Sequence, residues 1–145
     1  MPDQKVLLSL FGPDSDGWKE TVRRVFCDRK ILIEDIKSWE TEDYTSSEED
    51  LNYNHLISKD LDSLHSSDVI LIYFKEGYKN RFPFFSLGYF CNNDNLVILC
   101  SEDFSKRGIV QMICTRKNIP LFYTLEGAIG GCASKLNQKK FLLKK

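Results

Sequence analysis

Asp60 is the residue whose position in the sequence most strongly suggests a chemical role. Residues 51–65 have the apolar spacing of a helix, with a stripe that includes Leu61 and Leu64. Asp60 lies four residues after Leu56 and four before Leu64, so its carboxylate follows the edge of that stripe. A carboxylate beside a buried face costs free energy unless it is paired. Asp60 is therefore a functional candidate, although a hydrogen bond to a neighbouring backbone amide would also satisfy it.

The cysteines and histidines offer other reactive or metal-binding groups, but their spacing favours neither role. The chain has five widely spaced cysteines and no C-x-x-C pair, which predicts free thiols, no zinc site and a reducing, cytoplasmic location. Cys100 ends a strand-like run, yet no base lies near it in the sequence, so core packing is favoured over catalysis. His55 and His65 are ten positions apart, which is no metal-ligand spacing.

Several signatures of common α/β enzymes are absent. The sequence has no G-x-G-x-x-G after its first strand-like run, no G-x-x-x-x-G-K-[ST], no G-x-S-x-G and no H-E-x-x-H. Dinucleotide binding through the usual loop, P-loop phosphate chemistry, the α/β-hydrolase triad and zinc proteolysis therefore lack support. We expect no cofactor and no metal.

The composition indicates one globular domain. The chain has 145 residues, 42% of them hydrophobic, and a formal net charge of -1. Near-neutrality predicts no partner among nucleic acid polymers, and the absence of an apolar run of roughly 18 residues predicts no membrane span. The N-terminus is typical of a first strand and not of a signal peptide. We expect a domain over residues 1–138 and a frayed basic tail over 139–145.

Apolar runs and helical patterns alternate along the chain. The expected strands are residues 6–11, 31–33, 69–74, 96–100 and 120–123, and the expected helices begin at 18, 51, 82, 104 and 125, the last ending near 136. Right-handed crossovers then give a single doubly wound, five-stranded parallel sheet of the α/β class, covered by helices on both faces. Residues 34–50, with eight acidic side chains against one lysine, are expected to form a long loop.

Ligands of such sheets bind at the carboxyl ends of the strands. The loops expected to meet there are residues 12–17, 75–81 and 101–104. Asp14 and Asp16 in the first loop would repel a phosphate, so a neutral ligand is easier to accommodate there than a phosphorylated one.

Two segments resemble the nucleoside 2-deoxyribosyltransferase-like superfamily. Residues 56–71 (LISKDLDSLHSSDVIL) are similar to its segment from an acidic helix into the central strand, and residues 84–89 (FFSLGY) occupy the place of its E-L-G helix start. The strand-helix-strand order of residues 95–126 is also similar. The resemblance implies a flavodoxin-like or Rossmann-like domain, assembly into homo-oligomers, and chemistry at the N-glycosidic bond of a nucleoside or nucleotide.

In that superfamily the glutamate of E-L-G attacks the anomeric carbon and an aspartate on the preceding helix orients the substrate. The resemblance places Asp60 at the aspartate and Ser86 at the glutamate. A serine hydroxyl is neutral and needs a base before it can act as a nucleophile, so catalysis at this position requires a neighbouring group that the glutamate of the superfamily does not need. Asp60 and Ser86 are the catalytic candidates. The substrate-binding candidates are Phe11, Gly12, Asp14, Asp16, Trp18, Glu76 and Gly88.

Three functions stay open at this point. The protein could be an N-glycosidase or deoxyribosyltransferase in which Asp60, Asp14, Asp16 or Glu76 supplies the missing carboxylate. It could be a catalytically inactive relative that binds a nucleoside or nucleotide as a sensor or sequestering protein. It could also be a scaffold that presents an aromatic surface, made of Phe82, Phe84, Phe85, Tyr89 and Phe90, to a partner.

Overall fold

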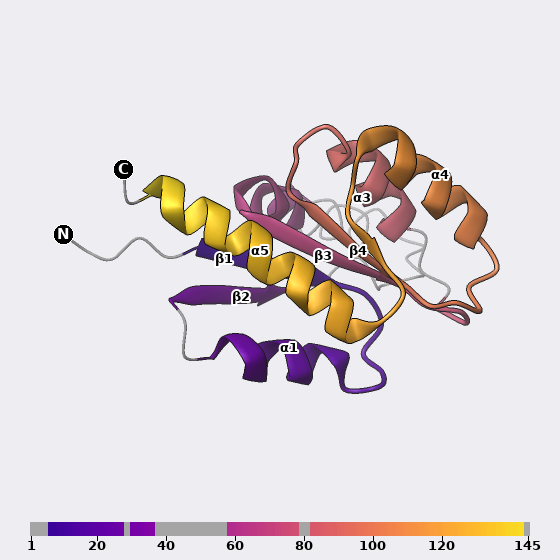
Figure 1. Ribbon diagram of the computed structural model, residues 1–145, viewed down its shortest axis with the longest axis horizontal. Coiled ribbons are helices and arrows are strands. Elements are labelled where there is room, and N and C mark those ends of the chain that lie inside the picture. Colours follow the sequence, from indigo (N-terminus) through magenta and orange to yellow (C-terminus); the bar gives the residue numbers. More distant parts are fainter. Residues whose placement is uncertain (1–5, 28–29, 37–57, 79–81, 144–145) are drawn as a thin grey trace, which may run out of the picture.

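Five parallel strands form the centre of the fold (Figure 1). The structure, a computed structural model, describes residues 6–27, 30–36, 58–78 and 82–143. The strands are β1 (Val6–Phe11), β2 (Ile31–Asp35), β3 (Val69–Phe74), β4 (Leu96–Cys100) and β5 (Leu121–Phe122). They lie in the order β2-β1-β3-β4-β5, and every neighbouring pair is parallel. This order is the doubly wound, flavodoxin-like arrangement, and it confirms the predicted fold class.

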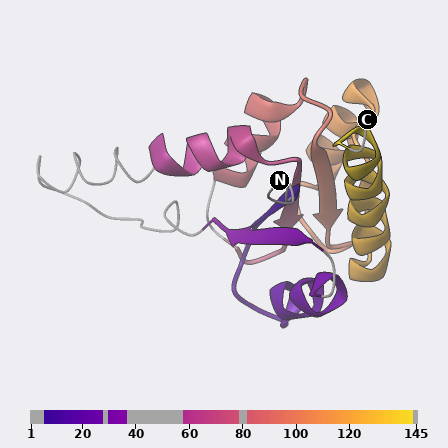
Figure 2. The same ribbon diagram turned by 90° about the vertical axis from the view of Figure 1, so that its left-hand side faces the viewer.

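Helices cover both faces of the sheet. They are α1 (Trp18–Phe26), α3 (Phe82–Phe90), α4 (Arg107–Lys117), α5 (Leu125–Leu143) and a helix whose described part is residues 58–66. Side chains of α1 and α5 pack on one face, and those of residues 58–66, α3 and α4 pack on the other. Figure 2 shows α5 and residues 58–66 on opposite sides of the sheet.

The strand sequences explain why both faces are buried. Successive side chains of a strand point to opposite faces. In β3, Val69 and Leu71 join the core beneath α1 and α5, whereas Ile70 and Ile72 join the core on the other face. All four are fully buried, as expected for a central parallel strand without polar alternation.

Several boundaries differ from the sequence-based expectation, and β5 is the shorter run Leu121–Phe122 instead of residues 120–123. β2 continues to Asp35, so the predicted acidic loop does not begin at residue 34. α4 begins at Arg107 instead of residue 104, because the amide of Phe104 donates to the Ser101 carbonyl in a turn (3.0 Å). α5 continues to Leu143, so residues 139–143 are helical and not a frayed tail. Residues 132–143 contain neither glycine nor proline, so nothing local ends the helix earlier.

Some expectations concern residues outside the described part of the chain. The rest of the acidic segment, residues 37–50, and the predicted helix start at residues 51–57, including His55, lie there. Within the described residues, no helix combines the length and apolar character needed to cross a membrane. The same residues contain no cluster of three or more His, Cys, Asp or Glu side chains that could hold a metal ion.

Three of the five free cysteines are buried in the core, namely Cys100, Cys114 and Cys132. Burial raises the pKa of the Cys100 and Cys114 thiols from 9.0 to about 11, and that of Cys132 to about 12. The folded state therefore favours the protonated thiols. As the pH rises above 9, thiols of the unfolded chain ionise first, and stability is lost until the folded thiols ionise as well.

We expect the free energy of unfolding to fall above pH 9 by about 1.4 kcal/mol per pH unit for each buried thiol. Urea unfolding at pH 8, 9.5 and 10.5 measures this slope. Cys132→Ala should give a shallower slope, whereas Cys27→Ala, at an exposed position, should leave it unchanged. Equal slopes in Cys132→Ala and the parent protein would contradict this explanation.

Candidate functional site

A cavity of about 410 Å³ lies at the carboxyl ends of the strands. It is bounded by the loop after β1, the ends of β3 and β4, and the start of α5. We call it the aromatic cavity, and its described lining residues are Asp16, Trp18, Tyr73, Leu99, Ser101, Glu102, Tyr123, Thr124 and Leu125. This edge is where open parallel sheets bind ligands, and the volume is within the range of roughly 300–1,000 Å³ seen for small-molecule sites.

Aromatic rings form one wall of the cavity. The rings of Trp18 and Tyr73 meet edge to face, with their centroids 5.3 Å apart. The Trp18 indole is 2% exposed, and its Nε1–H donates to the Pro13 carbonyl at 2.6 Å. These contacts hold the indole in one orientation, and because Trp18 is almost fully buried it supports the ring of Tyr73 from behind.

Gly12 allows the wall to form. A Cβ at this position would lie 2.9 Å from Trp18 Cζ2, 2.9 Å from Tyr73 Cβ and 3.2 Å from the Tyr73 carbonyl oxygen. The loop after β1 can therefore approach β3 closely only without a side chain at residue 12. Gly12 shapes the cavity through packing, and it is not among the described residues that line it.

The phenol of Tyr73 is held in its neutral form. Burial raises the pKa of Tyr73 above 10.0, and the carboxylates of Asp16 and Asp103 raise it further, against the opposing effect of Lys75. A protonated phenol can donate a hydrogen bond to a ligand oxygen or nitrogen at neutral pH. The second tyrosine of the cavity, Tyr123, accepts a hydrogen bond from Gln111 Nε2.

The polar wall carries hydroxyl and carboxylate groups. Asp16 has a left-handed backbone with a φ of 65°, and its carboxylate forms an ion pair with Lys75. The Thr124 hydroxyl accepts the Gly127 amide at 3.1 Å, which caps the start of α5. Glu102 also lines the cavity, whereas no Lys or Arg does so among the described residues. The wall can therefore bind hydroxyl and amino groups and disfavours anions.

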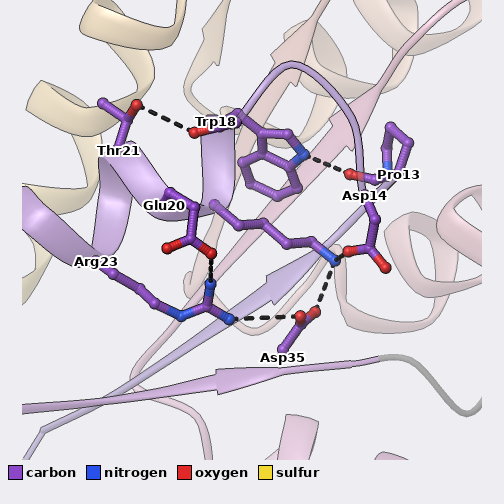
Figure 3. A network of polar contacts seen from close by, with 9 residues as sticks. Pro13, Asp14, Trp18, Glu20, Thr21, Arg23 and Asp35 are labelled. Atoms are coloured by element: carbon purple, nitrogen blue, oxygen red, sulfur yellow. Dashed lines mark hydrogen bonds and ion pairs between the residues drawn. The ribbon is translucent and has the colours of Figure 1, made fainter.

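A second cavity, of about 320 Å³, lies on the other side of Trp18, between α1 and β2. Lys19 is 5% exposed and donates to Asp14 and to Asp35, each at 2.7 Å. Arg23 bridges Asp35 at 3.5 Å and Glu20 at 2.8 Å (Figure 3). The charges of this cavity are already paired with one another, so it has less capacity for a ligand than the aromatic cavity.

Asp60 and Ser86, the two predicted catalytic residues, lie elsewhere. Both belong to helices on the face opposite α1 and α5, and neither is among the described residues lining the two cavities. Asp60 is 9% exposed. Ser86 is fully buried, and its hydroxyl has no hydrogen-bond partner among the described residues. A hydroxyl at 0% exposure cannot reach a substrate in this conformation, so the catalytic role of Ser86 stays a prediction that requires α3 to move.

The predicted binding residues have different positions. Asp16 and Trp18 line the aromatic cavity, and Asp14 lines the second cavity together with Trp18. Phe11 is fully buried in the core, and Gly88 is an exposed residue of α3 with open space around it. Glu76 accepts a hydrogen bond from the Ser105 amide at 2.6 Å, so its carboxylate joins two loops.

The aromatic surface predicted on α3 is only partly exposed. Phe85 and Tyr89 are each 51% exposed and stack with centroids 5.6 Å apart. Phe90 is fully buried, and Phe84 packs against Phe74 and Phe104. The side chain of Phe82 lies outside the described part of the chain.

Sequence reasoning missed several residues of the aromatic cavity. The sequence pattern places Tyr73 and Tyr123 in strands without indicating a ligand, and it does not distinguish Thr124 from other turn residues. Ser101 and Glu102 lie in a loop that was expected at this edge, but no role was given to either residue. The available signal was the position of each residue at or just after the carboxyl end of a strand.

Comparisons with known proteins support the fold. No protein-family model and no curated protein matches the chain. Among solved structures, a conserved protein from Enterococcus faecalis V583 is similar, with a TM-score of 0.57 and 12% sequence identity. The similarity covers 94% of this chain and 99% of that chain. At this identity the likeness shows the architecture alone, that of a doubly wound, flavodoxin-like α/β protein.

Proposed function

We propose that this protein binds a neutral nucleoside in the aromatic cavity. The observation that carries the proposal is the lining itself, in which Tyr73 and Tyr123 provide ring surface, supported by the buried Trp18, beside hydroxyl and carboxylate groups. Aromatic side chains bind the flat face of a base, and oxygen-bearing side chains bind the hydroxyls of a sugar. The resemblance to nucleoside 2-deoxyribosyltransferase-like proteins favours the same class of ligand.

The charge of the lining favours a nucleoside over a nucleotide. Asp16 and Glu102 line the cavity, and Asp103 lies close enough to raise the pKa of Tyr73. Of two nearby cations, Lys75 is already paired with Asp16, and Arg107 donates to the Glu102 carbonyl. A phosphate would therefore meet carboxylates, and no Lys or Arg among the described residues lines the cavity to offset its charge.

Calorimetric titration with a panel of nucleosides and their 5′-monophosphates tests the proposal. We expect at least one nucleoside to bind with a Kd on the order of 10–100 μM, since drug-sized ligands gain about 0.3 kcal/mol per non-hydrogen atom. Its 5′-monophosphate should bind roughly tenfold or more weakly, because of the acidic lining. No binding by any nucleoside would refute the proposal.

Tyr123→Leu is expected to weaken nucleoside binding roughly tenfold, since stacking of one base on an aromatic ring contributes about 1–3 kcal/mol. Tyr89→Leu is the matched control, because Tyr89 is an exposed tyrosine of α3 that does not line the cavity. Equal losses in the two variants would argue against binding in the aromatic cavity.

Hydrolysis of the N-glycosidic bond is the second candidate function. Asp16 and Glu102 both line the cavity, and a pair of carboxylates can supply the acid and base of glycoside hydrolysis. Chromatographic detection of free base tests this activity. Loss of base release in Asp16→Asn would place the chemistry in the aromatic cavity, whereas loss in Asp60→Asn would place it on the opposite face. No release from any nucleoside would leave binding without turnover.

A further inference from the structure

Three loops at the carboxyl edge of the sheet are joined through two consecutive residues, Lys75 and Glu76. These residues follow β3 in a turn closed by the amide of Tyr78, which donates to the Lys75 carbonyl at 3.2 Å. Gly77 has a φ of 88°, a backbone conformation that glycine adopts without strain. The turn therefore holds the two side chains in fixed directions at the centre of the edge.

Lys75 reaches the loop after β1. Its Nζ forms an ion pair with the Asp16 carboxylate and donates to Ser15 Oγ at 3.2 Å. Asp16 and Gly17 both have a φ of 65°. A left-handed aspartate is an uncommon conformation, and the two contacts from Lys75 favour the loop arrangement that contains it.

Glu76 reaches the loop after β4. Its Oε2 accepts the Ser105 amide at 2.6 Å, in the segment between β4 and α4. The same loop contains Ser101 and Glu102 of the cavity wall, and the Ser101 hydroxyl bonds to Asp103. Lys75 and Glu76 therefore contact the two loops that supply Asp16 and Glu102 to the polar wall of the aromatic cavity, although neither is among its described lining residues.

We propose that Lys75 and Glu76 are positioning residues that preorganise the aromatic cavity, and that Lys75 also offsets the charge that Asp16 presents to the ligand. This inference rests on the proposed nucleoside binding. Loops held in their bound arrangement lose less conformational entropy on binding, which increases affinity without a direct contact. The partial neutralisation of Asp16 reduces, but does not remove, the discrimination against phosphate.

Nucleoside affinity of paired variants tests the first part. Lys75→Met and Glu76→Leu are each expected to weaken binding roughly fivefold, whereas Lys75→Arg and Glu76→Gln keep the donor or acceptor and should stay within about twofold of the parent. Lys117→Met is the control, since Lys117 is an exposed lysine bonded to Asn92 outside the cavity. Unchanged affinity in both Lys75→Met and Glu76→Leu would overturn the inference.

The ratio of nucleoside to 5′-monophosphate affinity tests the second part. Lys75→Met should increase this ratio roughly threefold, because the Asp16 carboxylate is no longer offset. Glu76→Leu should leave the ratio unchanged, since it loosens a loop without altering the charge at Asp16. An equal change in the two variants would overturn the charge-offsetting role of Lys75.

Amide exchange of the ligand-free protein separates this inference from the proposed function. Protection of the Ser105 amide should be lost in Glu76→Leu and kept in Glu76→Gln, whichever ligand the cavity binds. If no nucleoside binds and the Ser105 protection follows this pattern, the proposed function is wrong. The role of Glu76 in holding the loop after β4 is then still supported. If Ser105 protection is unchanged in Glu76→Leu, the joining of the loops is wrong.

Discussion

Asp35→Asn is expected to lower the free energy of unfolding by about 2 kcal/mol, and the double variant Asp14→Asn, Asp35→Asn by about 4 kcal/mol. Lys19 is 5% exposed and donates to both carboxylates at 2.7 Å. Loss of both negative charges leaves a buried ammonium group without an opposing charge, and the desolvation of that group is no longer offset.

The two single variants should lower the free energy of unfolding by different amounts. The Asp35 side chain is 14% exposed and also contacts Arg23, whereas the Asp14 side chain is 47% exposed. Water screens the Asp14 contact more strongly, so Asp14→Asn should cost less than about 1 kcal/mol. Urea unfolding at a constant pH of 7 measures all three variants.

Glu20→Gln is the matched control for this network. Its partner Arg23 is 39% exposed and Glu20 is 71% exposed, so removal of this ion pair should cost no more than about 0.5 kcal/mol. If Asp14→Asn lowers the free energy of unfolding as much as Asp35→Asn does, burial does not set the strength of these ion pairs.

Gly12→Ala is expected to destabilise the protein by about 2–3 kcal/mol and to reduce nucleoside affinity. The added methyl group would lie within 3.2 Å of two side-chain atoms and one backbone oxygen. Relief of these contacts requires β3 and the Trp18 ring to separate from the loop after β1, which costs packing energy and changes the wall of the cavity. Thermal unfolding and nucleoside titration measure the two effects.

Gly88→Ala provides the opposite result in a matched substitution. Gly88 lies within α3 and has no atom within 4 Å of the position that a Cβ would occupy. Alanine is the better helix former, so this variant should be about 0.5–1 kcal/mol more stable than the parent protein. Destabilisation by Gly88→Ala would contradict the open space described around Gly88. Tolerance of Gly12→Ala would contradict the close contacts described at Gly12.

The sequence predicts a cytoplasmic location, and its resemblance to nucleoside 2-deoxyribosyltransferase-like proteins predicts a homo-oligomer. The oligomeric state can be measured by light scattering over a range of concentrations. A concentration-independent monomer would weaken the proposal that Phe85 and Tyr89 face a partner.

The sequence alone determined the kind and order of the elements. The apolar run of residues 69–74 predicts a central strand because burial on both faces removes any need for polar alternation. The spacing of Trp18, Val22, Val25 and Phe26 predicts the apolar face of α1. Trp18, Val22 and Phe26 are buried, whereas Val25 is 42% exposed. These signals are local, since each depends on residues within one element.

The tertiary structure alone decided which side chains meet. Leu10 of β1 pairs with Asp35 of β2, and this register brings Asp35 to the loop after β1, where Lys19 can contact it. Tyr73 and Tyr123 line the same cavity because β3, β4 and β5 are neighbours in the sheet and their carboxyl ends lie at one edge. Strand order and register depend on contacts between distant parts of the chain, so no local pattern could have predicted these partners.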